Sequence, residues 1–128
     1  MKMLSSVTTK FRENCRGFWK DYRWFIIVFG IALVCDAAST VYFMLESGPE
    51  TELHPAIQFI SSHVLGPIAG PLFAAFAKLT AGIVVAVYCR RFAVYIFSAT
   101  SVISFWAAWY NVWGSKIYTP SFLKWIFW

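Results

Sequence analysis

The hydrophobic residues of the chain fall into three long runs separated by short, more polar segments. The runs cover residues 24–45, 71–89 and 92–113. Folded as a helix, each is long enough to cross the ~30 Å hydrocarbon layer of a membrane. The first run contains one acid, but its many Leu, Ile, Val and Phe residues outweigh the cost of inserting a single charge. We therefore predict three transmembrane helices.

A different pattern precedes the first run. In residues 1–23, apolar side chains recur at helical spacing and basic side chains occupy the other faces. The apolar set is Leu4, Val7, Phe11, Cys15, Phe18 and Tyr22. This arrangement is typical of an amphipathic helix that lies in the plane of the lipid headgroups. A frayed basic tail is the alternative interpretation.

Between the first two runs lies a turn-forming acidic loop followed by a short apolar stretch. Pro55 opens this stretch, which we predict to be a helix over residues 55–65, and Gly66-Pro67 is expected to stop it. A helix of this length covers roughly half a bilayer, so it lies at the interface or re-enters without spanning. The aromatic residues 114–128 are also too short to span, and we expect them to lie along the interface.

Composition supports a membrane protein, because 59% of the residues are hydrophobic and only 13% are charged. Soluble domains carry about one quarter charged residues. The expected fold class is an all-α integral membrane protein with three transmembrane helices, an N-terminal interfacial amphipathic helix and a re-entrant or interfacial half-helix. The formal net charge is +5. No basic stripe alternates with exposed aromatic residues, so contact with anionic lipid headgroups is a better interpretation than binding to nucleic acid.

The distribution of charge predicts an orientation. Six of the eleven Lys and Arg residues lie in residues 1–23, and three of the six acids lie between Glu46 and Glu52. The positive-inside rule places the N-terminus and Arg90-Arg91 in the cytoplasm and the acidic loop outside. The C-terminus is then outside as well.

Asp36 in the first span and Lys78 in the second are the sharpest signal in the sequence. Measured from the outer ends of their spans, they lie about 13 Å and about 10 Å deep. Opposite charges at matching depth on consecutive antiparallel spans are expected to pair, since either charge alone in lipid is costly. The pair either fixes helix register or serves a proton or ion relay. In a third interpretation, one of the two charges reaches a partner protein.

The other polar residues give weaker indications of a functional site. Thr40 lies one turn above Asp36, and its hydroxyl either bonds the carboxylate or bonds back onto its own helix. Glu52, His54 and Pro55 lie in the predicted outer loop. A mixture of carboxylate and imidazole can bind zinc or copper, but no spacing here matches a known ligand pattern. We expect no metal site, no cofactor and no soluble small-molecule substrate.

The ordered pattern of these residues resembles that of a family of small prokaryotic multi-span membrane proteins. The family pattern is Asp-x-x-(Ser/Thr)-Thr in a first span, Glu-x-Asn-Pro in the outer loop and Lys in the next span. The matching residues here are Asp36, Ser39, Thr40, Glu52, Pro55 and Lys78, with His54 in place of Asn. The resemblance covers roughly residues 24–90. It implies a shared helical fold in a prokaryotic cell membrane, but no activity.

Small and polar residues also form stripes on the second and third predicted spans. These are Gly70, Ala74, Ala77 and Ala81, and then Thr100, Ser104, Ala108 and Asn111. No phosphate-binding loop or nucleophile–base pair points to an enzyme. We therefore expect a non-catalytic subunit that packs against a larger energy-converting or oxidising membrane complex. The alternative is a small homo-oligomeric transporter or channel that uses Asp36 and Lys78.

Overall fold

The computed structural model describes residues 1–48, 52 and 55–114, and this part of the chain is helical without a strand. Three of its helices are long and apolar enough to cross a membrane, as predicted. They are α2 (Phe18–Ser47), α4 (Gly66–Tyr88) and the stretch Arg90–Trp113, which is mostly α5. The fold class is therefore that of an all-α membrane protein.

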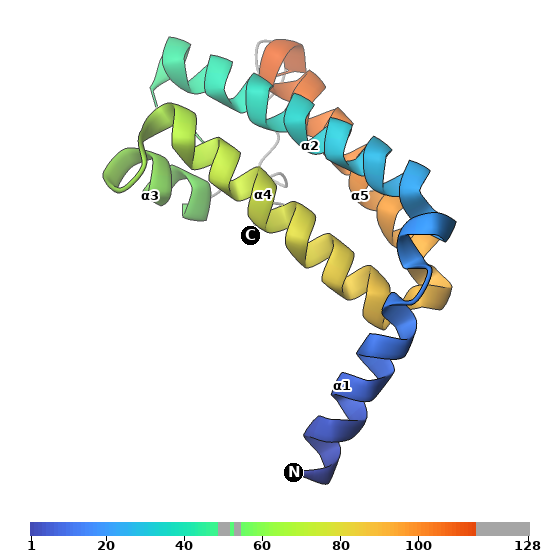
Figure 1. Ribbon diagram of the computed structural model, residues 1–128. Coiled ribbons are helices and arrows are strands. Elements are labelled where there is room, and N and C mark those ends of the chain that lie inside the picture. The colour runs from blue at the N-terminus through green and yellow to red at the C-terminus, as the bar shows by residue number, and fades with distance from the viewer. Residues whose placement is uncertain (49–51, 53–54, 115–128) are drawn as a thin grey trace.

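The three long helices form a bundle in which α2 packs along both α4 and α5 (Figure 1). The last of them begins as a short 3-10 turn, η2 (Arg90–Phe92), and continues as α5 (Ala93–Trp109). It ends in a π-helical turn, η3 (Tyr110–Gly114). Its limits agree with the predicted span over residues 92–113.

The first helix, α1 (Lys2–Cys15), lies outside the bundle and runs crosswise to α4 (Figure 1). The basic segment predicted over residues 1–23 is thus split, and its last part belongs to α2. Gly17 causes the break, because its φ of +69° is a left-handed conformation that suits glycine. The chain turns there, and a new helix starts at Phe18.

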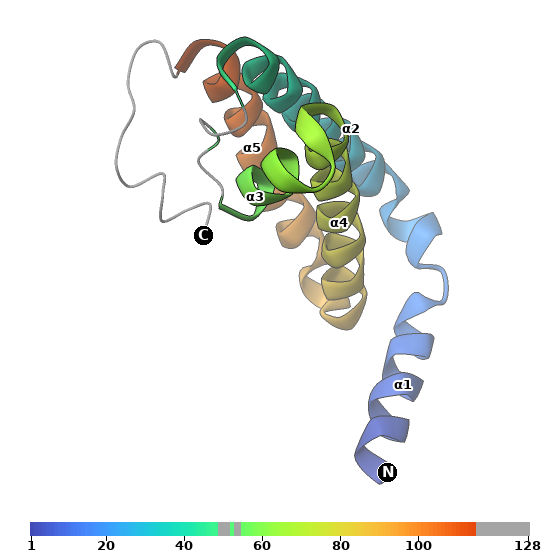
Figure 2. The same cartoon turned by 90° about the vertical axis from the view of Figure 1, so that its left-hand side faces the viewer.

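The half-helix, α3 (Pro55–His63), packs against the first turns of α4 (Figure 2). The two are in close contact at Gly70, where a Cβ would lie 3.0 Å from the Cα of Ser61. Gly66-Pro67, expected to end the half-helix, instead opens α4. Proline suits the first turn of a helix, where its missing N–H needs no partner, so α4 starts before the predicted residue 71.

The apolar core lies at the end of the bundle near Gly17. The rings of Phe29 and Phe97, on α2 and α5, are 5.7 Å apart. Phe97 is fully buried. The buried members of this core are Phe18, Phe29, Leu33, Ala86, Val87, Ala93 and Phe97. One group of polar residues lies beyond this core, toward the C-terminal half of α2, and includes Asp36, Ser39 and Thr40.

Candidate functional site

The predicted ion pair joins α2 to α4. Nζ of Lys78 lies 3.2 Å from Oδ2 of Asp36, which confirms that the two side chains are within salt-bridge reach. The pair is not buried within the chain. The Asp36 side chain is 13% exposed, and the Lys78 side chain is 39% exposed. We expected a buried ion pair, and the burial is not confirmed, because the other helices of the described chain leave one side of Lys78 uncovered.

The hydroxyl groups beside Asp36 bond back onto their own helix. Ser39 and Thr40 each donate a hydrogen bond of 2.8 Å to the main-chain oxygen of Asp36. Of the two alternatives for Thr40, this is the bond that the structure contains. Both residues are buried, and their hydroxyl oxygens keep lone pairs that can accept further hydrogen bonds.

The third helix completes the network through Asn111. Its amide nitrogen donates to Oγ1 of Thr40 at 2.9 Å and to Oγ of Ser39 at 3.1 Å. Asn111 lies in the π-helical turn η3, a type of distortion that is frequent at functional sites. The sequence placed Asn111 on a polar stripe but did not identify these partners. One polar network therefore links all three long helices.

A small cavity lies beside the ion pair. Its volume is about 10 Å³, roughly the room that one water molecule needs. Its lining comes from α2, α3 and α4: Asp36, Ala37, Thr40, Ile57, Pro71, Ala74, Ala75 and Lys78. The half-helix α3 thus contributes Ile57 to the lining of the cavity. The space suits a bound water better than a small-molecule ligand.

A second polar cluster lies at the opposite end of the bundle, around Arg90. One of its guanidinium nitrogens donates to the main-chain oxygens of Asn14 at 2.9 Å and Arg16 at 2.7 Å. The other nitrogen lies 2.5 Å from Oδ2 of Asp21. From the sequence, Arg90 served only to predict which end of the bundle faces the cytoplasm. No local pattern relates it to partners that lie 69 to 76 residues away.

The guanidinium of Arg90 also lies over two aromatic rings of α2. Its central carbon is 5.8 Å from the ring centre of Phe18 and 5.9 Å from that of Tyr22. Cations are attracted to the faces of aromatic rings at such distances. The hydroxyl of Tyr22 in turn donates to the main-chain oxygen of Arg90 at 3.3 Å. Arg90 therefore joins the end of α1, the start of α2 and the turn between α4 and α5.

The residues of the predicted outer loop are only partly described. Pro55 opens α3 as expected, and Glu52 is half-buried. His54 lies outside the described residues. Within the described ranges, no group of three His, Cys, Asp or Glu side chains is arranged to hold a metal ion.

No family model, curated protein or solved structure matches the chain. The resemblance to small prokaryotic membrane proteins therefore remains a prediction from the Asp36, Thr40 and Lys78 pattern.

Proposed function

We propose that the protein is a non-catalytic membrane subunit that packs against another membrane protein. The observation that carries this proposal is the 39% exposure of the Lys78 side chain. Exposed lysine is ordinary in water, but Lys78 lies midway along an apolar helix of membrane-spanning length. Its partial exposure there calls for a partner.

The position of Lys78 in α4 leaves its ammonium no route to the headgroups. The residue lies roughly 18 Å from the start of α4 at Gly66 and roughly 15 Å from its end at Tyr88, at 1.5 Å per residue. Lysines near helix ends bend toward the interface, but a central one has to find acceptors inside the membrane. An ammonium has three donors, and one of them bonds Asp36. A second helix beside Lys78 would supply acceptors and exclude lipid.

The outer face of α4 suits such a contact. Only 11% of the apolar window of α4 is buried within the chain. Ala77 and Ala81 are exposed on this helix. Small residues allow close approach of helix backbones in lipid, where large apolar residues gain little from leaving the acyl chains. Because Ala81 lies one helical turn from Lys78, the small residues and the charged side chain can contact the same partner helix.

Two other surfaces of the bundle are covered by helices of the same chain. A Cβ on Gly82 would lie 2.6 Å from the ring of Phe29, so α2 covers that side of α4. Ser104, on the polar stripe of α5, is buried. These two surfaces are therefore less available to a partner than the side of α4 that carries Ala77 and Ala81.

The competing proposal is a small homo-oligomeric transporter or channel that uses Asp36 and Lys78. A transport path needs a continuous series of polar groups reached by water. Here Asn111, Thr40 and Ser39 bond one another, and the cavity beside the ion pair holds about one water. These features favour a structural role for the polar network.

A photo-activatable amino acid at Ala81 tests the subunit proposal in native membranes. The matched control is the same amino acid at Val34, which is 65% exposed on α2. We expect Ala81 to cross-link to a different membrane protein and Val34 to react mainly with lipid. Lys78→Met should lower the yield from Ala81. Lipid adducts alone at both positions, together with full stability of the isolated chain, would contradict the proposal, and adducts to a second copy would favour the homo-oligomer.

We also propose that the protein resides in a prokaryotic cell membrane, with its N-terminus in the cytoplasm and the acidic loop and C-terminus outside. The positive-inside rule supports this orientation through the basic residues of α1 and the Arg90-Arg91 turn, which lie at the same end of the bundle. The resemblance described above supports the type of cell.

A further inference from the structure

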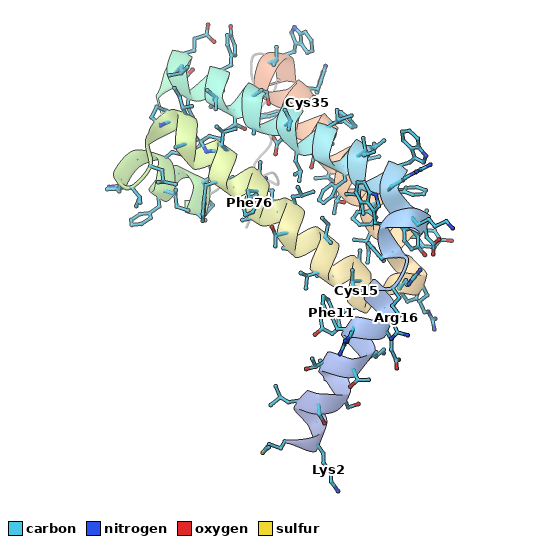
Figure 3. The ribbon with its side chains drawn as sticks, in the orientation of Figure 1. Lys2, Phe11, Cys15, Arg16, Cys35 and Phe76 are labelled. Carbon is cyan, nitrogen blue, oxygen red and sulfur yellow. The ribbon has the colours of Figure 1, made fainter. Side chains whose placement is uncertain are left out.

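The apolar side of α1 faces toward the membrane-spanning bundle. The ring of Phe11 lies 4.8 Å from that of Tyr88, near the end of α4, and Figure 3 shows Phe11 on the α4 side of its helix. Leu4 and Val7 share this side by helical spacing. They are 75% and 45% exposed, so nothing in the described chain covers them. If α4 crosses a bilayer, these side chains are directed toward its acyl chains.

The rest of α1 and the start of α2 are basic and exposed. Two acids, Glu13 and Asp21, accompany this segment, and the Arg90 guanidinium pairs with Asp21. The exposed basic side chains are Lys2, Lys10, Arg12, Arg16, Lys20 and Arg23. A surface with this excess of positive charge, next to an apolar stripe, matches the anionic headgroup layer of a membrane.

The Arg90 cluster fixes the direction in which α1 leaves the bundle. Carbonyl groups at the end of a helix lack intrahelical donors, and Arg90 supplies donors to Asn14 and Arg16. The amide of Asn14 also donates to the main-chain oxygen of Tyr88 at 3.4 Å. These bonds connect the end of α1 to the turn after α4. Gly17, the flexible residue between α1 and α2, is thus braced on both sides.

We infer that α1 is a rigid arm that lies in the plane of the membrane and binds anionic phospholipid headgroups, at an angle set by Arg90. The basic side chains contact the headgroups while Leu4 and Val7 enter the acyl boundary. This role is independent of the proposed subunit contact on α4. Each basic residue near an anionic surface adds about 1 kcal/mol, which corresponds to roughly fivefold in affinity, so removing two of them should weaken the contact by about 25-fold.

Spin labels on the full chain in vesicles test the arm directly. Cys15, Cys35 and Cys89 are first replaced, and single cysteines are introduced by Val7→Cys and, as the matched control on the opposite side, Thr9→Cys. In vesicles with one third anionic phosphatidylglycerol, the label at residue 7 should be accessible to oxygen and protected from a water-soluble nickel complex. The label at residue 9 should show the reverse. In pure phosphatidylcholine, the difference between them should shrink.

Arg90→Gln tests the brace. The label at residue 7 should become more mobile and lose its protection. Lys10→Gln combined with Arg12→Gln should reduce protection without increasing mobility in the same way. Equal exposure of residues 7 and 9 in anionic vesicles would overturn the inference. If the label at residue 7 were equally protected from the nickel complex in anionic and in neutral vesicles, the proposed binding to anionic headgroups would be overturned. Protection in native membranes but not in vesicles would show that the arm binds a protein partner and not lipid.

Discussion

The ring of Phe29 on α2 fills the space next to Gly82 on α4. A Cβ at residue 82 would lie 2.6 Å from Cε1 and 2.9 Å from Cζ of that ring. Phe29 is 2% exposed and also contacts Phe97, so its ring has little room to shift. The absence of a side chain at Gly82 therefore sets how closely α2 and α4 approach.

Gly82→Ala should lower the stability of the bundle by about 1–3 kcal/mol, the usual range for overpacking a closed core. Gly30→Ala is the matched control, because Gly30 also lies in a long helix and a Cβ there meets nothing within 4 Å. That control should be neutral or stabilising by up to ~1 kcal/mol through helix propensity. Thermal unfolding in mild detergent, followed by circular dichroism, compares the two. Equal midpoints would contradict the close contact.

The Asp36–Lys78 pair should behave as a coupled unit. Removing one partner of a buried pair costs about 3–5 kcal/mol, and the 39% exposure of Lys78 reduces the expected loss to the lower part of that range or below. Asp36→Asn and Lys78→Met should each destabilise the bundle, and the double variant should be less destabilised than the sum of the two. A double-mutant cycle in the same detergent measures the coupling. Strict additivity would show that the two charges do not interact.

The contact between Asn111 and Thr40 should also contribute to stability. Thr40→Val removes the acceptor for Asn111 and the bond to the main chain of Asp36, and should cost roughly 1 kcal/mol. Thr80→Val is the matched control, since the Thr80 hydroxyl bonds only back to Phe76 on an exposed face. The difference between the midpoints of the two variants isolates the contact between α2 and η3. No difference would mean that the interhelical bond adds nothing.

The sequence predicted the three long helices and the pairing of Asp36 with Lys78. The length of an apolar run is enough to predict a membrane-spanning helix. Opposite charges at equal depth on neighbouring spans are enough to predict an ion pair. Those rules do not describe which side of each helix faces inward. For that reason the exposure of Lys78 and the covering of Gly82 by α2 could not be predicted.

The helix limits near glycine and proline were less predictable, because each of these residues can either end one helix or begin the next. Gly66-Pro67 was expected to stop α3 and instead opens α4, where Pro67 occupies the first turn. Arg90 illustrates a second limit. Its partners Asn14, Arg16 and Asp21 lie far away in the chain, and no spacing rule connects them.

Cysteine labelling tests the proposed orientation. A single cysteine introduced by Ser47→Cys, at the exposed end of α2, should react in intact cells with a reagent that cannot cross the membrane. The native Cys15 is a matched site at the other end of the bundle and is exposed. With the other cysteines replaced, it should react only after the membrane is broken. The reverse pattern would invert the topology.

The contacts of Arg90 also determine the order in which parts of the structure form during synthesis. Arg90 is made 76 residues after Asn14 and 69 residues after Asp21, and chains emerge with the N-terminus first. Both α1 and α2 therefore exist before the guanidinium that joins them. Until the turn after α4 has been made, the bonds of Asn14 and Arg16 to Tyr88 and Arg90 cannot form. The final direction of α1 is acquired late, so a chain truncated before Arg90 would carry an arm without a defined angle.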